Sequence, residues 1–153
     1  MNGQWSEDLA TGIELLDSQH KEFFQHINML RSAMRAGEGR DALVRTLEFL
    51  EGYVRVHFNA EEMYMRRFNY PDLSVHEQEH KDFIKLLSDY GKKFQELDSR
   101  GEITSFLVVE IARKLSGWQE DHIRSVDRNM GAFLVGKLRA ANTDDPKLYV
   151  RSA

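Results

Sequence analysis

Apolar residues recur at alternating intervals of three and four along four long stretches of the chain. Leu47, Leu50 and Val54 follow this spacing, which places their side chains on one face of an α-helix. No stretch shows the strict alternation of apolar and polar residues that is typical of a strand. The pattern predicts four helices, at about residues 17–36, 41–68, 72–100 and 103–130.

Residues suited to helix ends stand between these stretches. The expected N-terminal caps are Asp17 or Ser18, Asp41 and Asp72. Gly37 and Gly101 are expected to end the first and third helices, because glycine readily adopts the left-handed conformation that follows a helix. Four helices joined by short links favour an antiparallel arrangement. The sequence therefore predicts an all-α protein, an up-down-up-down four-helix bundle.

The chain also has a segment on either side of the four helices. Residues 1–16 are expected to form an arm that Trp5, Leu9 and Ile13 anchor onto the core. Residues 131–153 are expected to form a C-terminal extension with a short amphipathic turn or two before a polar tail. The chain has 153 residues and shows no internal repeat or low-complexity linker. We therefore expect residues 1–153 to form a single domain.

Several polar residues occupy inward positions of the second and third helices. His57 and Glu61 are four residues apart, and so are His76 and His80. Residues four apart lie on the same face of a helix, so each pair can direct two ligand atoms at one point. At a rise of about 1.5 Å per residue, Glu61 and His80 both lie about 10–12 Å from the turn that joins the two helices.

Two more histidines are expected at the same level of the bundle. His20 lies in the first turn of the first helix, and His122 lies about 10 Å from the end of the fourth. Both of these helix ends belong to the end of the bundle that holds the turn at Tyr70-Pro71. Five of the six histidines should therefore meet in the core. His26 points to another side of the first helix and is expected at the surface or boundary.

A metal site explains this convergence better than five separate core histidines. A single histidine on an apolar face is usually a hydrogen-bonded core residue. Several neutral imidazoles in an apolar core, however, leave nitrogens to satisfy, at roughly 1–3 kcal/mol for each one left unpaired. A shared metal ion satisfies them at once. Imidazole and carboxylate ligands in this arrangement suit iron, zinc, copper or manganese.

Composition and charge exclude several other classes of protein. The net charge of −4 argues against a nucleic-acid surface, and the absence of cysteine excludes disulfides, thiolate ligands and iron–sulfur clusters. The N-terminus lacks a basic segment followed by an apolar run, so no signal peptide is expected. The longest apolar stretch, residues 106–112, is too short to span a bilayer. We therefore expect a cytoplasmic protein without membrane insertion.

Two short motifs offer alternative metal chemistry. Residues 76–80 match HExxH, the helix motif in which two histidines bind zinc and the glutamate acts as a general base. A peptidase also needs a substrate cleft, often beside a strand edge, and Glu77 is one residue away from the inward face. Glu77 and His80 form one Glu-x-x-His motif, which di-iron carboxylate proteins use twice. A zinc peptidase thus remains a remote alternative.

Taken together, these residues resemble the hemerythrins, and among them the single-domain bacterial hemerythrins. The resemblance covers about residues 5–130. The segments that carry it are Gly12-Ile13, residues 17–21 (DSQHK), His57-Phe58 with Glu61-Glu62, Tyr70-Pro71, His76, His80, Trp118, His122-Ile123 and Asp127. All ligand positions of the family carry the expected residue types.

The resemblance implies a di-iron centre and the role of each ligand. His76, His80 and His122 would bind one iron ion, and His20 and His57 the other. Glu61 and Asp127 would bridge the two ions, together with an oxo or hydroxo group from solvent. One coordination position, on the iron ion with two histidines, would remain open for O2. A ligand set this rich in neutral imidazole favours reversible O2 binding over oxidation of a substrate.

The resemblance also implies an O2 pocket beside the open position. Its expected residues are Phe23, Phe58, Trp118, Gln119 and Ile123. Where this sequence has Gln119, the family usually has leucine. Gln119 would bring an amide or a water molecule near the open iron, unless it turns to solvent.

Asp127 does not fit an ideal helix. It follows His122 by five residues, which places it about 140° around a regular α-helix from that histidine. The family pattern alone assigns it as a ligand. A locally widened turn is needed if both side chains are to face the metal.

The predicted function is non-enzymatic, reversible O2 binding for storage, transport or delivery. An oxygenase or a redox protein would be the partner in delivery. The alternatives are an O2 or redox sensor and a di-iron oxidase or peroxidase-like enzyme. The sequence predicts no particular oligomeric state.

Overall fold

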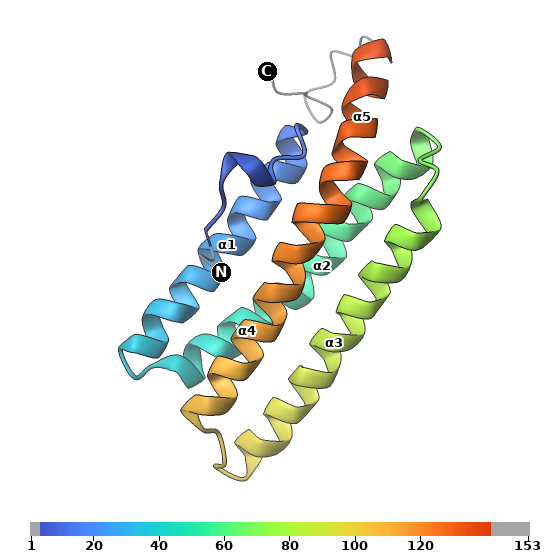
Figure 1. The fold of residues 1–153 in the computed structure, drawn as a ribbon. Helices are drawn as coiled ribbons and strands as arrows, with labels where there is room; N and C mark the ends of the chain where they lie inside the picture. The colour runs from blue at the N-terminus through green and yellow to red at the C-terminus, as the bar shows by residue number, and fades with distance from the viewer. Residues whose placement is uncertain (1–3, 142–153) are drawn as a thin grey trace.

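A computed structural model of the chain describes residues 4–141. Within them the chain forms only helices and the links between them (Figure 1). The elements are the 3-10 helix η1 (Glu7–Leu9), α1 (Glu14–Arg35), α2 (Gly39–Arg67), α3 (Leu73–Ser99), α4 (Ser105–His122), the π-helical turn η2 (Ile123–Asp127) and α5 (Arg128–Ala141).

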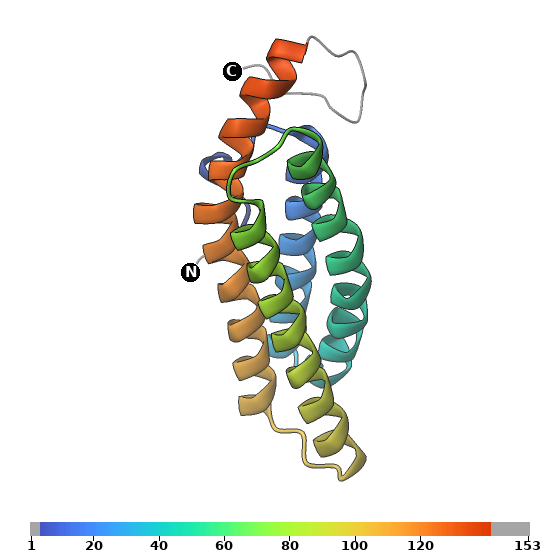
Figure 2. The same ribbon diagram turned by 90° about the vertical axis from the view of Figure 1, so that its right-hand side faces the viewer.

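The four long helices lie side by side and alternate in direction. In Figure 1, the α1–α2 and α3–α4 links lie at one end of the bundle and the α2–α3 turn lies at the other. α4, η2 and α5 form one continuous rod that extends past the other helices at the α2–α3 end (Figure 2). The predicted all-α four-helix bundle is confirmed.

Three helices end in the same way, with a residue of positive φ after the last turn. Gly37 (φ 79°) follows α1, Asn69 (φ 55°) follows α2 and Gly101 (φ 67°) follows α3. After α1, the amide of Glu38 donates to the carbonyl of Ala33 over 2.8 Å, as expected for a Schellman motif. The predicted ends at Gly37 and Gly101 are confirmed.

Two predicted helix starts are wrong. α1 begins at Glu14 instead of Asp17 or Ser18, and α2 begins at Gly39, ahead of Asp41. Asp17 is fully buried within the first turn of α1, where its carboxylate accepts hydrogen bonds from the backbone and hydroxyl of Thr11. The aspartate therefore ties the arm to the helix instead of capping it.

The starts of α3 and α4 agree better with the sequence. Asp72 occupies the N-cap position of α3, as predicted, without a side-chain hydrogen bond. Thr104 is exposed and caps α4, because its hydroxyl accepts a hydrogen bond from the amide of Leu107.

The helical rod continues farther than predicted. Instead of a short turn or two, residues 131–141 of the extension continue the 14-residue helix α5 to Ala141, and residues 142–153 lie outside the described part of the chain. Leu134 and Leu138 of α5 are buried in a small core of their own. The other buried members of this α5 core are Ile13, Leu16, Tyr64, Met65 and Met130.

The larger core fills the bundle between the site and the α1–α2 link. It includes Phe24, Leu43, Leu50, Phe83 and Ile111, all almost fully buried. Leu9 and Ile13 of the arm are also buried, and Trp5 packs against this core, so the three predicted anchors are confirmed. Among residues 4–141, no helix combines the length and the apolar character needed to cross a membrane.

Candidate metal centre

Helical elements from every part of the bundle bring buried ligand groups to one level of the core. These groups are His20 from α1, His57 and Glu61 from α2, His76 and His80 from α3, His122 from α4 and Asp127 from η2. Each is at most 3% exposed. The convergence of five histidines expected from helix periodicity is therefore present. His26 stays apart, half-buried and stacked on Phe49, as expected.

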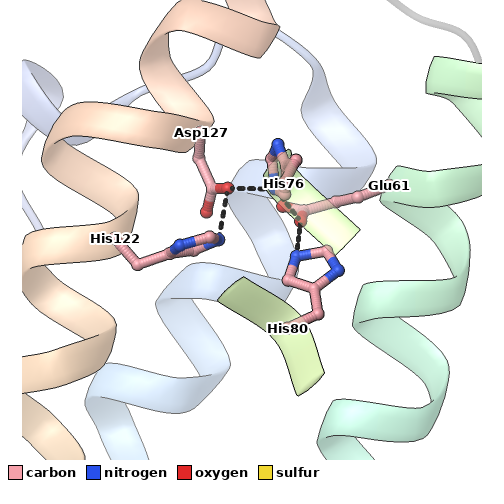
Figure 3. Close-up of side chains that lie close together, drawn as sticks. All are labelled: Glu61, His76, His80, His122 and Asp127. Carbon is pink, nitrogen blue, oxygen red and sulfur yellow. Dashed lines mark hydrogen bonds and ion pairs between the residues drawn. The ribbon is translucent and has the colours of Figure 1, made fainter. Parts of the chain in front are cut away.

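The ligand atoms form two groups that share both carboxylates. Glu61, His76, His80, His122 and Asp127 form the three-histidine group (Figure 3). His20, His57, Glu61 and Asp127 form the two-histidine group. Within each group, one ligand atom from every residue lies within 4.8 Å of all the others.

Glu61 directs one oxygen to each group. Its Oε1 lies 3.0 Å from Nε2 of His57 and 3.6 Å from Nε2 of His20. Its Oε2 lies 3.0 Å from Nε2 of His80 and 3.3 Å from Nε2 of His76. A carboxylate placed in this way can bridge two metal ions.

Asp127 also directs one oxygen to each of the two groups. Its Oδ2 lies 3.1 Å from Nε2 of His20, and its Oδ1 lies 3.0 Å from His122 and 3.1 Å from His76. The π-helical turn η2 widens the helix between His122 and Asp127 and so turns both side chains inward. The locally widened turn that the sequence required is confirmed.

The imidazoles that line the site point their Nε2 atoms inward and hold Nδ1 toward the outside. Nδ1 of His57 lies 2.7 Å from Oε1 of Gln19, and Nδ1 of His122 lies 2.7 Å from Oε2 of Glu79. Nδ1 of His80 lies 2.9 Å from a Glu62 oxygen. Such partners fix the tautomer that leaves Nε2 free to bind a metal ion.

These three outer partners were not predicted from the sequence. Gln19, Glu62 and Glu79 each stand next to a ligand in the chain, which is a visible signal. However, each one contacts a histidine of a neighbouring helix. Helix periodicity alone cannot assign such a pair.

The two carboxylates are held in their charged forms. Burial raises the pKa of Glu61, but the charge of His57 and hydrogen bonds from His20, His57 and His76 lower it well below its usual value. Burial and the charge of Glu61 raise the pKa of Asp127, but the charge of His122 and hydrogen bonds from His122 and His20 hold it well below its usual value.

Burial and the two carboxylates shift the pKa values of the histidines in different directions. Burial lowers the pKa of His20 and His76, but hydrogen bonds from both to Asp127 and Glu61 raise the first to about 9 and the second to about 10. For His122 burial lowers the pKa, but the charge and hydrogen bond of Asp127 together with the charge of Glu61 raise it above its usual value. For His57 burial dominates and lowers it. Without metal, protons on some of the imidazoles therefore balance the two buried carboxylates.

The nitrogen and oxygen atoms of the site are arranged to bind metal ions more than to hydrogen-bond one another. Oε1 of Glu61, both Asp127 oxygens and Nε2 of His122 are buried, and none makes a hydrogen bond of good geometry despite the short contacts. Nε2 of His20 and Nε2 of His57 face one another at 3.0 Å. When the imidazoles give up their protons, the converging lone pairs are left without donors, and a cation can satisfy them. Nitrogen and oxygen donors without sulfur suit iron, manganese or zinc.

Aromatic and apolar side chains enclose the site. Phe58 stacks on His80 at 3.8 Å between ring centroids and also lies 5.8 Å from the His57 ring. Trp118 stacks on His122 at 4.7 Å, so it lies beside the three-histidine group. Phe23 and Ile123 are fully buried. Gln119 is also fully buried, so it does not turn to solvent.

The HExxH segment is not arranged as in a zinc peptidase. His76 and His80 belong to the three-histidine group, but Glu77 forms an ion pair with Arg66, which is more than half exposed. Glu77 therefore does not face the metal ligands.

Comparisons with known proteins identify relatives of this chain. A family model described as the hemerythrin HHE cation binding domain matches residues 11–134. A bacteriohemerythrin of Pseudomonas paraeruginosa is 34% identical over 123 residues, which cover 80% of this chain and 75% of that protein. A myohemerythrin of Theromyzon tessulatum is 27% identical, over 81% of this chain and 87% of its own length.

The fold comparison gives the same result. A crystal structure of a hemerythrin mutant superposes with a TM-score of 0.69 at 29% identity, and the match covers 84% of this chain and 94% of that chain. The family match spans the segments that supply all the ligand groups, from His20 to Asp127. The chain belongs to the hemerythrin family.

Proposed function

We propose that this protein holds two iron ions and binds O2 reversibly, for storage, transport or delivery. The observation that carries the proposal is the pair of shared carboxylates. Glu61 and Asp127 each offer separate oxygens to a three-histidine group and to a two-histidine group. Two ions held in this way receive unequal numbers of protein ligands, so the ion with two histidines keeps room for an outside ligand.

The residues around the site suit binding better than turnover. When bound, two ferrous ions would supply the two electrons and the open position that O2 requires. The chain supplies five imidazoles and only two carboxylates as inner ligands, and neutral ligands stabilise highly oxidised iron poorly. Buried Phe23, Phe58 and Ile123 limit the access of water. These features support a carrier over an oxidase.

Metal content and the visible spectrum test the proposal. Protein expressed with iron should contain about two iron ions per chain. After reduction, air should produce a charge-transfer band that disappears on degassing and returns on re-exposure. Irreversible bleaching with release of peroxide would indicate an oxidase, and one zinc ion per chain would contradict a di-iron carrier.

A pair of histidine variants provides the control. His20→Ala removes an inner ligand of the two-histidine group and should lower the iron content and abolish the band. His26→Ala removes a half-buried histidine of the same helix outside both groups, and should change neither. Equal loss in both variants would show that the iron content reports folding and not ligation.

A further inference from the structure

Two buried polar side chains beside the centre have no hydrogen-bond partner of good geometry. They are Tyr53, at its hydroxyl, and Gln119, at both the oxygen and the nitrogen of its amide. Gln119 is fully buried and Tyr53 is 6% exposed. Buried polar groups are nearly always paired. Such groups next to a metal centre therefore indicate a missing polar partner.

Tyr53 lies over the two-histidine group. It precedes His57 by one turn of α2, and the two rings stack at 5.0 Å with 18° between their planes. From α1, the ring of Phe23 lies 5.7 Å from the Tyr53 ring, three residues after His20. The ring of Tyr53 therefore lies on the side of the two-histidine group.

Gln119 belongs to α4, where it lies one turn before His122 and is buried. The pKa of Tyr53 is raised well above its usual value, first by burial and then by the charges of Glu61 and Asp127, while a polar side-chain contact with Gln119 lowers it. The amide and the hydroxyl are thus close neighbours within reach of both bridging carboxylates. Neither group makes a hydrogen bond of good geometry with the other, so both can still pair with a third polar group.

A cavity on the outside leads toward Tyr53. It has a volume of about 400 Å³, lies between α1 and α2, and is lined in part by Gln19, Gly52, Tyr53 and His57. A Cβ atom at Gly52 would have no neighbour within 4 Å, so the cavity is open at this point. Tyr53 and His57 of the two-histidine group therefore both line this cavity.

We propose that Tyr53 and Gln119 form a polar recognition pair for the free end of a small ligand bound at the two-histidine ion. This inference rests on the proposed di-iron site. The hydroxyl and the amide nitrogen can donate hydrogen bonds, and the amide oxygen can accept one. The pair selects small anions and diatomic molecules whose outer atom accepts a hydrogen bond. An entirely apolar pocket would not distinguish them from ligands with a weakly accepting end.

Anion binding to the oxidised, iron-loaded protein tests the pair without relying on O2. Azide and cyanate present a strongly accepting outer atom, whereas N-bound thiocyanate presents sulfur, a weak acceptor. Tyr53→Phe and Gln119→Leu should each weaken azide and cyanate binding by about 5- to 10-fold, as expected for the loss of one hydrogen bond. Thiocyanate binding should change by less than about twofold. The dissociation constants are measured by titration of the visible spectrum.

Tyr64→Phe is the matched control. Tyr64 is a buried tyrosine of the same helix, but it packs in the α5 core. Its replacement should leave the affinity for all three anions unchanged. Unchanged azide and cyanate affinity in both Tyr53→Phe and Gln119→Leu would overturn the inference, as would an equal loss of thiocyanate binding.

The stability of the metal-free protein provides a second readout. If Tyr53 and Gln119 served only to join α2 to α4, each single variant would lower the thermal midpoint and the double variant would lower it no further. For a recognition pair that lacks its ligand, replacing unpaired polar groups by apolar ones should leave the midpoint unchanged or raise it. If the single variants lower the thermal midpoint, the double variant lowers it no further and anion affinity does not change, the inference is overturned.

The outcomes for the pair and for the centre are distinguishable. Wild-type protein that fails to bind two iron ions contradicts the proposed function itself. Wild-type protein that binds two iron ions and azide, with variants that behave like wild type, contradicts only the recognition pair. Iron content is therefore measured on every variant before the anion titration.

Discussion

At the scale of single residues, the centre depends on groups that do not touch the metal position. His57, His80 and His122 are each held through Nδ1 by a polar side chain from a neighbouring helix. Two of these outer partners are carboxylates and the third is an amide. The outer partners therefore set the orientation of three of the five imidazoles and keep their Nε2 atoms directed into the site.

Glu79→Ala tests this outer support. Loss of its contact with Nδ1 of His122 should weaken metal binding at the three-histidine group by about 10- to 100-fold. The affinity is measured by competition with a chelator. Gln78→Ala is the control, since Gln78 is exposed and donates a hydrogen bond to Asp82 on its own helix, away from the histidines. Equal metal affinity of Glu79→Ala and Gln78→Ala would show that the contact of Glu79 with His122 does not strengthen metal binding.

At the scale of elements, the rod formed by α4, η2 and α5 connects the centre to the arm. The π-helical turn adds one residue to the helix and turns Asp127 inward. A turn of this kind is rare and occurs mostly at functional sites. Beyond it, α5 packs against the arm, with Gly131 directly over the backbone of Thr11. Contacts of α5 with the arm therefore hold the end of the turn that carries Asp127.

Gly131→Ala tests the close approach of α5 to the arm. A Cβ atom at residue 131 would meet the backbone oxygen of Thr11 and lie 2.8 Å from its Cα. The backbone must move, so the free energy of unfolding should fall by about 1–3 kcal/mol. Urea denaturation followed by circular dichroism measures the change.

Gly136→Ala is the control in the same helix. Gly136 is exposed, and a Cβ atom placed on it would have no neighbour within 4 Å. Alanine favours the helix there, so the free energy of unfolding should rise by about 0.5–1 kcal/mol. A similar change in both variants would mean that α5 does not depend on contact with Thr11.

At the scale of the whole molecule, metal binding and folding are coupled through one buried charged cluster. The bundle places Glu61 and Asp127, both fully buried, in the middle of its core. In the metal-free protein, raised pKa values at His20 and His76 keep protons there to balance them. A metal ion must displace these protons, so its binding depends on pH.

The pH dependence of metal affinity tests this exchange. The pKa of His20 is about 9 and that of His76 about 10, so both imidazoles are protonated near pH 7 without metal. Loading should release at least these two protons, so affinity should rise by about 100-fold or more per pH unit between pH 6 and 7.5. Competition with a chelator, corrected for its own protonation, measures the slope. A flat profile would show that the histidines are already neutral.

The same protons affect the stability of the metal-free fold. A histidine whose pKa is raised on folding stabilises the folded state fully below its ordinary pKa near 6.5. This contribution is lost as the pH rises through about 9 for His20 and about 10 for His76. Metal-free protein should therefore unfold at lower temperature at pH 9.5 than at pH 6.5, and metal should reduce the difference.

The sequence was sufficient wherever one helix determines the geometry. Spacings of three and four residues predict the four helices, and the same spacing places His57 beside Glu61 and His76 beside His80. Their positions relative to the helix ends then predict the common level of the ligands. These features depend only on the pitch of the α-helix and the alternation of direction in a bundle, both of which are local and regular.

Tertiary structure decided what depends on contacts between elements. A spacing of five residues does not bring Asp127 to the side of His122; the widened turn does, within a rod that packs against the arm. Leu134 and Leu138 become core residues because Ile13 and Met65 cover them. The sequence left open whether Gln119 faces solvent or the centre, and packing of α4 against the bundle buries it. The sequence alone determined the helices and the inventory of ligands, whereas the choice of which side chains meet required the free energy of packing between helices.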